Sequence, residues 1–210
     1  MNLFGLELSG DSATWFTGLA SLFVGIVALF GKRIYDYFFG PRLKLAYGDE
    51  WECTEDGDYG KIFGCAVSGE VDARVIRIKV ENTGKETATK CYGKITRTKF
   101  NGQELQGFTP IHLVWASRQH ARIKLFKSKS EIDLAPNDTD YLNVCTTWKQ
   151  NQPKLMPNAA YPFNADKYLP AGTYDFQISI FGSNFSARTL TLEVKNTGKW
   201  HQMEAKEKKN

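Results

Sequence analysis

The stretch of this chain best suited to binding chemistry is a basic segment between residues 118 and 129. Phe126 stands among its lysines and arginines, Trp115 lies just before it, and no acidic residue occurs between Glu104 and Glu131. Basic side chains with interspersed aromatic rings bind anionic lipid or a nucleic-acid backbone, although an ordinary solvated loop has the same composition. The candidate contacts for a ligand or a membrane are Trp115, Arg118, Arg122, Lys124, Phe126, Lys127 and Lys129.

A second charged group is acidic and lies in a predicted loop that contains Gly57 and Gly60. Carboxylates gathered on a loop can hold calcium through their oxygens, but the spacing here does not match an EF-hand loop. A solvated loop explains the same pattern, so both interpretations stay open. The acidic residues are Asp49, Glu50, Glu52, Glu55, Asp56 and Asp58.

The residue types that bind metals are too dispersed to predict a metal site. His112, His120 and His201 form no pair at ligand spacing with one another or with a cysteine. The cysteines lack the C-x-x-C spacing of structural zinc sites. Their even number permits two disulfides in an oxidising compartment, whereas free, buried thiols are expected in a reducing one. The four cysteines are Cys53, Cys65, Cys91 and Cys145.

Catalytic motifs are missing as well. The sequence contains no GxSxG, HExxH, P-loop or GxGxxG pattern, and nothing marks a serine or cysteine as an activated nucleophile. We therefore expect no enzyme activity and no cofactor. The formal net charge of +4 is a mild excess, which argues against a nucleic-acid binder.

An uncharged run from Ser12 to Gly31 dominates the N-terminal region. A helix of about 20 residues spans roughly 30 Å, the thickness of the bilayer hydrocarbon. Aromatic residues at both margins, such as Trp15 and Tyr35, suit the two membrane interfaces. A cleaved signal peptide would need basic residues before the run, and a buried core helix would need a polar face. The sequence therefore predicts one retained transmembrane helix.

Basic residues predict the side on which the rest of the chain lies. Lys32, Arg33, Arg42 and Lys44 follow the uncharged run, and no basic residue precedes it. The positive-inside rule then places the C-terminal side in the cytoplasm. We expect a single-pass protein of the cell (inner) membrane, with its N-terminus outside and its domain in the cytoplasm, where thiols stay reduced.

Small residues at Thr17, Ser21 and Gly25 recur every four positions along the predicted helix. Small residues at this spacing allow two helices in a membrane to approach closely. A helix-mediated homodimer is therefore one expectation, and an anchor without a helix partner is the other.

Beyond Pro41 the hydrophobic pattern changes from helical spacing to alternation. Alternation places one face of each strand in a core and the other in water. Turn signals such as Asn82-Thr-Gly and Asn101-Gly separate the runs. About seven short strands without intervening helices predict an antiparallel sandwich. Strands are expected at 43–47, 76–81, 90–100, 111–116, 132–134 followed by 141–145, 174–180 and 189–194.

Two segments carry a resemblance to a family of folds. Residues 75–91, V-I-R-I-K-V-E-N-T-G-K-E-T-A-T-K-C, are similar to the strand–turn–strand signature of immunoglobulin-like sandwiches of the CARDB and fibronectin III kind. Residues 169–180, L-P-A-G-T-Y-D-F-Q-I-S-I, resemble the penultimate strand of such domains. The resemblance implies a membrane-anchored protein of prokaryotic type, and it is silent on activity because this sandwich hosts many functions.

The pattern Val-x-Asn-Thr-Gly-Lys occurs twice, at 80–85 and at 194–199. The residues around the two copies do not match. We interpret the pattern as a strand-ending turn used twice, and not as a tandem repeat.

Together these features predict a mainly β fold, in which a single N-terminal transmembrane α-helix is followed by an immunoglobulin-like antiparallel β-sandwich. Residues 1–40 would form the anchor and juxtamembrane segment, and 41–198 the sandwich. Residues 199–210 would form a charged tail, either frayed or a short helix.

The function expected from these features is that of a membrane-tethered protein-interaction or scaffold module without catalytic activity. Its partners would be the lipid bilayer, through the helix, and a protein at the membrane. The alternative is a membrane-anchored binding domain for an anionic polymer, a lipid headgroup or a carbohydrate.

Overall fold

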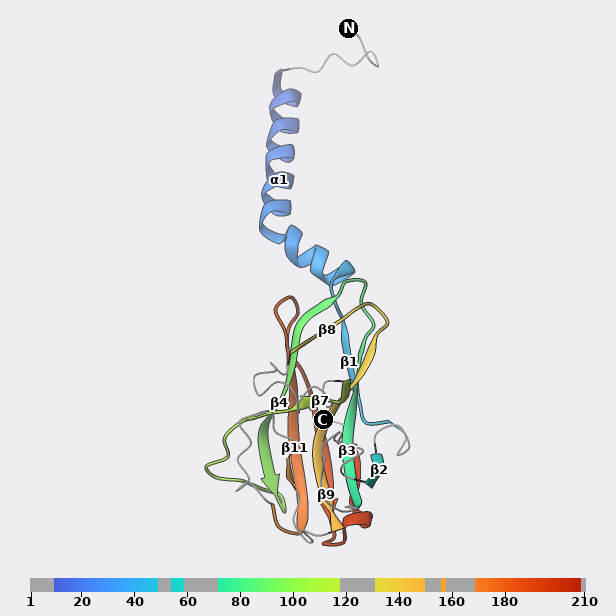
Figure 1. Cartoon of the computed structure of the whole chain (residues 1–210). Coiled ribbons are helices and arrows are strands. Elements are labelled where there is room, and N and C mark those ends of the chain that lie inside the picture. The colour runs from blue at the N-terminus through green and yellow to red at the C-terminus, as the bar shows by residue number, and fades with distance from the viewer. Residues whose placement is uncertain are drawn as a thin grey trace. The chain divides into compact units, whose positions relative to one another are not determined.

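A computed structural model describes residues 10–48, 54–58, 72–117, 131–149, 156–157 and 169–208. The chain divides into two compact units, Met1–Gly40 and Pro41–Asn210. In the described residues, the first unit holds one helix and the second holds two antiparallel sheets (Figure 1).

Helix α1 runs from Gly10 to Phe39. It ends just before Gly40 and Pro41, because proline lacks an amide hydrogen and disfavours helical geometry in the residue before it. The helix expected over the uncharged run is confirmed. Within the described residues, no helix has the length and hydropathy that a membrane crossing requires. The transmembrane span at 12–31 therefore stays a prediction.

One sheet is centred on β3, which pairs with β1 and β2 along one side and with β9 along the other. Strands β7 and β10 pair with the far side of β9. The sheet consists of β1 (Leu43–Ala46), β2 (Thr54–Asp58), β3 (Asp72–Asn82), β7 (Val114–Trp115), β9 (Thr139–Trp148) and β10 (Met156–Pro157).

The other sheet has the order β13-β12-β11-β4, and three short strands pair with β4 at successive points along its remaining edge. All of these pairs are antiparallel. The sheet consists of β4 (Ala88–Phe100), β5 (Gln103–Glu104), β6 (Ile111–His112), β8 (Ile132–Leu134), β11 (Gly172–Phe181), β12 (Arg188–Asn196) and β13 (Glu204–Lys208).

Both sheets contribute alternate apolar residues to one hydrophobic core. Ile78, Phe176, Ile178 and Leu192, which are apolar positions of the predicted alternating strands, are all fully buried. Two antiparallel sheets that share a core make a mainly β fold compatible with a β-sandwich, and this part of the predicted fold is confirmed.

The repeated Val-x-Asn-Thr-Gly-Lys pattern ends a strand with the same side-chain hydrogen bond in both places. The Oδ1 atom of Asn82 accepts a hydrogen bond from the amide of Gly84 at 3.0 Å. The Oδ1 atom of Asn196 accepts one from the amide of Gly198, also at 3.0 Å. Asparagine favours turns because its side chain bonds to the backbone two residues later. The structure therefore agrees with a strand-ending turn used twice.

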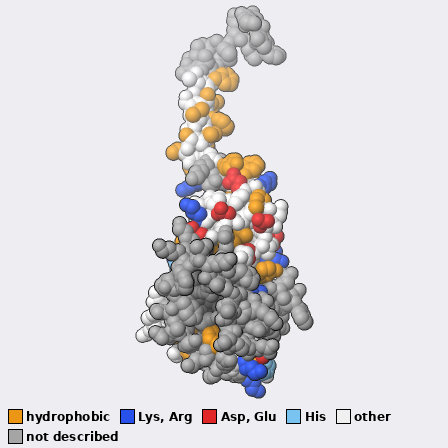
Figure 2. All heavy atoms as spheres, viewed as in Figure 1, with side chains coloured by type: hydrophobic (Ala, Val, Ile, Leu, Met, Phe, Trp, Pro, Cys, Tyr) orange, Lys and Arg blue, Asp and Glu red, His pale blue; other side chains and the backbone are white. Residues whose placement is uncertain are grey.

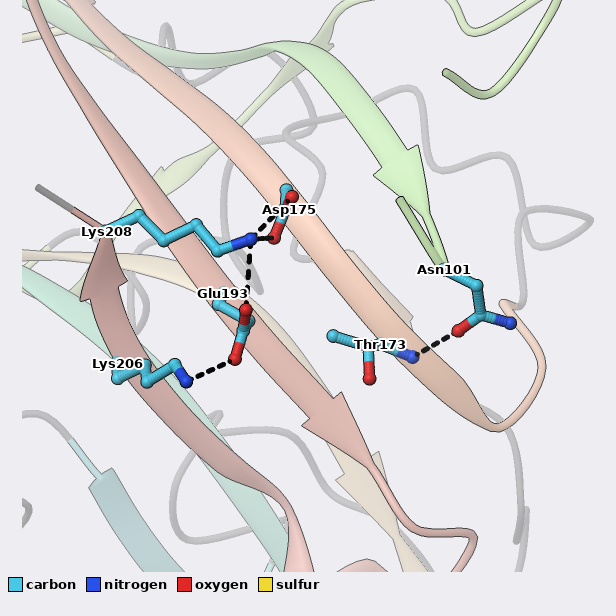
Figure 3. Close-up of polar contacts among 6 residues, drawn as sticks. All are labelled: Asn101, Thr173, Asp175, Glu193, Lys206 and Lys208. Atoms are coloured by element: carbon cyan, nitrogen blue, oxygen red, sulfur yellow. Dashed lines mark hydrogen bonds and ion pairs between the residues drawn. The ribbon is translucent and has the colours of Figure 1, made fainter. Parts of the chain in front are cut away.

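The C-terminal tail differs from its prediction. Residues 199–210 were expected to fray or form a short helix, but Trp200–Gln202 form a 3-10 turn and β13 pairs with β12. The side chain of Met203 is buried in the core. On β13, Lys206 and Lys208 form ion pairs with Glu193 at 2.8 and 3.0 Å (Figure 3). The buried Met203 side chain and the ion pairs with Glu193 thus hold the tail against β12 as an edge strand.

Candidate functional site

Neighbouring strands of the second sheet bring a cluster of aromatic and basic side chains together. Tyr92 on β4 lies opposite Phe181 on β11, and Lys94 lies opposite His112 on β6. The Tyr92 ring stacks on Phe181 with centroids 5.4 Å apart and on His112 with centroids 5.6 Å apart. We call these four residues the aromatic–lysine cluster.

The ammonium group of Lys94 is held over the rings of this cluster. Its Nζ atom lies 5.3 Å from the centroid of Tyr92 and 5.8 Å from that of Phe181. Cations are attracted to aromatic faces at these distances. Partial burial, and then the charge of Lys94, lower the pKa of the His112 imidazole. The cluster therefore offers an apolar surface, a fixed cation and a largely neutral imidazole at neutral pH.

A cleft of about 660 Å³ opens beside β4. Strand β6 pairs with β4 at Lys94 and Ile95, and β5 pairs with it at Lys99 and Phe100. Between these two points the cleft lies between β4 and the chain that joins β5 to β6. Its walls are Thr96, Arg97, Thr98, Gln103, Glu104, Leu105, Gln106, Gly107 and Phe108.

An irregularity in β4 shapes the same region. Arg97 lies opposite Gln177 and Ile95 lies opposite Ile178, so Thr96 is an extra residue in β4. Its hydroxyl donates a hydrogen bond to the carbonyl of Gln177 at 3.1 Å. Bulges of this kind bend a strand and redirect its side chains, and they are frequent near functional sites.

The structure corrects the prediction that Trp115 contacts a ligand or a membrane. Its side chain is fully buried, and its indole N–H donates to the carbonyl of Cys91 at 3.2 Å. A ring enclosed in the core cannot meet a ligand, so Trp115 is a packing residue. The other predicted contacts, Arg118, Arg122, Lys124, Phe126, Lys127 and Lys129, lie outside the described residues, and their role stays a prediction.

The predicted acidic loop is only partly described. Glu55, Asp56 and Asp58 belong to strand β2, whereas Asp49, Glu50 and Glu52 lie outside the described residues. Within the described part of the chain, no three or more His, Cys, Asp and Glu side chains gather as metal ligands would.

The cysteines that the structure describes, Cys91 and Cys145, are free and buried. Burial raises the pKa of the Cys91 thiol to about 12 and raises that of Cys145 as well. Because the thiolate is the reactive form, neither is suited to nucleophilic chemistry. Cys53 and Cys65 lie outside the described residues.

Sequence reasoning did not identify the aromatic–lysine cluster or the cleft. Tyr92 and Phe181 are far apart in sequence and meet only through the register of β4 and β11. The sequence analysis considered His112 only as a possible metal ligand. The pairing of β4 with β11 and with β6 brings the residues of the cluster together.

No protein-family model matches this chain, and a search of curated proteins found no related sequence.

Proposed function

We propose that this protein is a membrane-tethered interaction module without catalytic activity of its own. Helix α1 holds the β domain at a lipid bilayer, and the domain binds a protein partner there. The observation that carries the proposal is the exposed apolar surface of α1.

Bulky apolar side chains cover most of α1. Ten of them between Trp15 and Phe30 are each at least 44% exposed. Figure 2 shows hydrophobic side chains along the visible face of the helix. At 3.6 residues per turn they occupy more than half of the helix circumference, whereas a helix on the surface of a globular protein needs a narrower apolar stripe. They are Trp15, Phe16, Leu19, Leu22, Phe23, Val24, Ile26, Val27, Leu29 and Phe30.

A bilayer is the environment that would cover such a surface. The run from Ser12 to Gly31 has no charged residue, and a helix of about 20 such residues matches the hydrocarbon thickness. Lys32, Arg33 and Arg42 follow the run, which supports a cytoplasmic domain in the cell (inner) membrane.

The strand order supports an immunoglobulin-like domain of the CARDB and fibronectin III kind. In immunoglobulin constant domains, strands ABED form one sheet and CFG the other. Assigning A, B, E and D to β1, β3, β9 and β7 reproduces the first sheet, and C, F and G to β4, β11 and β12 the second. The hydroxyl of Tyr174, near the start of β11, donates to the carbonyl of Pro170 at 2.7 Å, as a tyrosine corner does.

The aromatic–lysine cluster is the surface that we assign to the protein partner. Aromatic residues are enriched in protein interfaces, and those that dominate binding energy are often aromatic. In this cluster, Tyr92 and Phe181 are half-buried and His112 is exposed. A partner side chain with a carboxylate would meet the ammonium of Lys94.

Alkaline carbonate extraction of membranes tests the tether. The chain should stay in the membrane pellet, and Val24→Arg should release it, since an arginine at the centre of a spanning helix costs about 2.5–3.5 kcal/mol. Phe38→Arg, beyond the uncharged run, is the matched control and should stay in the pellet. Release of the unaltered chain would show that α1 does not anchor it.

Co-purification from membranes tests the partner surface. A protein recovered with the unaltered chain should be lost with Tyr92→Ala and with Phe181→Ala. It should be retained with Thr191→Ala, a half-buried position on β12 outside the cluster. Recovery that is unchanged by both cluster variants would assign the interaction to another surface.

A second candidate function is a membrane-anchored binding domain for a non-protein ligand. The cleft beside β4 favours this alternative, because its volume of about 660 Å³ lies within the range of small-molecule sites.

A further inference from the structure

We propose that the cleft beside β4 binds a neutral sugar ring, as a monosaccharide or one end of an oligosaccharide. This inference names a ligand class for the binding domain proposed above. It rests on three features of the cleft: how the chain forms it, which polar groups line it, and which apolar side chains form its walls.

The backbone fixes the cleft at one place along β4. The amide of Leu105 donates to the carbonyl of Thr98 at 2.9 Å, and the amide of Phe108 donates to the carbonyl of Leu105 at 3.3 Å. Gly107 lies within the turn that the second bond closes, and its φ of 71° is in the left-handed region. Glycine adopts this conformation without steric cost, so the cleft results from a defined turn.

The polar groups of the cleft suit hydroxyl groups. Arg97 offers only donors, Glu104 accepts only, and the carboxamides of Gln103 and Gln106 do both. A hydroxyl donates one hydrogen bond and accepts others, so adjacent hydroxyls on a sugar ring can meet each of these groups. All four side chains are exposed at the cleft.

The charges of the cleft favour a neutral ligand. Arg97 and Glu104 bring one positive and one negative charge to its walls. A phosphate or a dicarboxylate would meet Arg97 but would also be placed near the Glu104 carboxylate, and like charges brought together disfavour a ligand. A ligand without net charge avoids that repulsion and still uses both groups.

The cleft also has apolar walls. The side chains of Leu105 and Phe108 are half-buried and line it beside the polar groups. Ligand sites combine apolar walls with a few polar groups that fix orientation. The C–H faces of a sugar ring are apolar, whereas its edges carry hydroxyls, which matches this mixture.

Saturation-transfer NMR on the full chain in lipid nanodiscs tests the proposal. Nanodiscs are chosen because many detergents carry sugar headgroups. The probes are glucose, galactose and mannose, together with maltose, lactose and mannobiose, and sialic acid serves as an anionic comparison. At least one neutral probe should receive saturation, and sialic acid should bind more weakly.

Variants assign the binding to the cleft. Arg97→Ala and Gln106→Ala should each raise the Kd of the bound probe by about ten-fold or more, whereas Arg188→Ala, an exposed arginine on β12 outside the cleft, should leave it unchanged. Circular dichroism should show both cleft variants folded, since both side chains are exposed.

Three results would overturn the proposal: no saturation of any neutral probe, preferential binding of sialic acid, or unchanged affinity in both cleft variants. Each is distinguishable from failure of the proposed function. A chain that resists carbonate extraction and recovers a partner through Tyr92, but binds no sugar, keeps the tethered module and loses only the ligand.

Discussion

Replacing Asn82 by alanine is expected to destabilise the β domain more than most single substitutions. The Asn82 side chain is fully buried at the end of β3. Its Oδ1 atom accepts from the amides of Arg42 at 3.2 Å and Gly84 at 3.0 Å. Its Nδ2 atom donates to the carbonyls of Glu86 at 2.8 Å and Leu134 at 2.9 Å. One amide thus links the start of β1, the turn after β3 and strand β8.

The expected loss in the free energy of unfolding follows from these four hydrogen bonds. A typical hydrogen bond contributes a net amount of about 0.5–1.5 kcal/mol, and a buried partner left unsatisfied costs about 1–3 kcal/mol. Water can reach some of the four partners, because the bonds to Arg42 and Glu86 are only partly buried, whereas those to Gly84 and Leu134 are buried. We therefore expect Asn82→Ala to lower the free energy of unfolding by about 2–4 kcal/mol.

Thermal or urea unfolding of the full chain measures this loss. A domain of this size should lose roughly 5–15 °C in Tm, since 1 kcal/mol shifts Tm by about 2–4 °C. Thr83→Ala is the matched control, because the Thr83 hydroxyl makes an exposed bond to the carbonyl of Arg42; it should cost less than about 1 kcal/mol. A loss below about 1 kcal/mol for Asn82→Ala would refute the assigned role of the amide.

Three further predictions concern the core, the cluster histidine and the buried thiols. Phe176→Ala should lower the free energy of unfolding by about 3–5 kcal/mol, as measured by urea unfolding, and a value under about 1 kcal/mol would contradict the burial of this ring. NMR titration should give His112 a pKa below 6.5, and Lys94→Gln should raise it because a neighbouring positive charge is removed. The folded state then binds the His112 proton more weakly than the unfolded chain, so stability should fall as the pH drops from about 6.5 through the lower folded-state pKa; a folded-state pKa above 6.5 would reverse that sign. Cys91 and Cys145 should react with a thiol reagent only after unfolding, and rapid labelling of either in the native chain would contradict their burial.

Alternation of apolar residues was sufficient to predict the long strands. β3, β11 and β12 each have one buried and one solvated face, and this pattern is visible without a structure. The turn after β4 was also predictable, because a two-residue hairpin of this type requires positive φ angles at both positions and therefore favours Asn-Gly. Asn101 and Gly102 both have positive φ angles.

Strands without an apolar pattern were not predictable in the same way. β13 has charged residues at four of its five positions, so hydrophobic periodicity gives no signal there. Its backbone pairs with β12, and its lysines form ion pairs with Glu193 on β12 and with Asp175 on β11. β2 was not predicted either, because it has no apolar alternation and its acidic residues were interpreted as a loop.

The candidate sites were the least predictable features, because they depend on strand register. Trp115 was predicted as a contact from its neighbourhood in sequence, yet the pairing of β7 with β9 places its ring in the core. Conversely, Tyr92 and Phe181 have no sequence relation, and the register of β4 with β11 places their rings side by side. A change of one residue in register would move each ring to the opposite face.

Protease protection in cells tests the central claim, that α1 crosses the membrane and holds the β domain on its inner face. The chain is expressed with one epitope at its N-terminus and another at its C-terminus, and protease is added to intact spheroplasts. The account predicts loss of the N-terminal epitope and full protection of a fragment that contains the β domain and the C-terminal epitope. Protection of both epitopes, or digestion of the β domain before lysis, would contradict it.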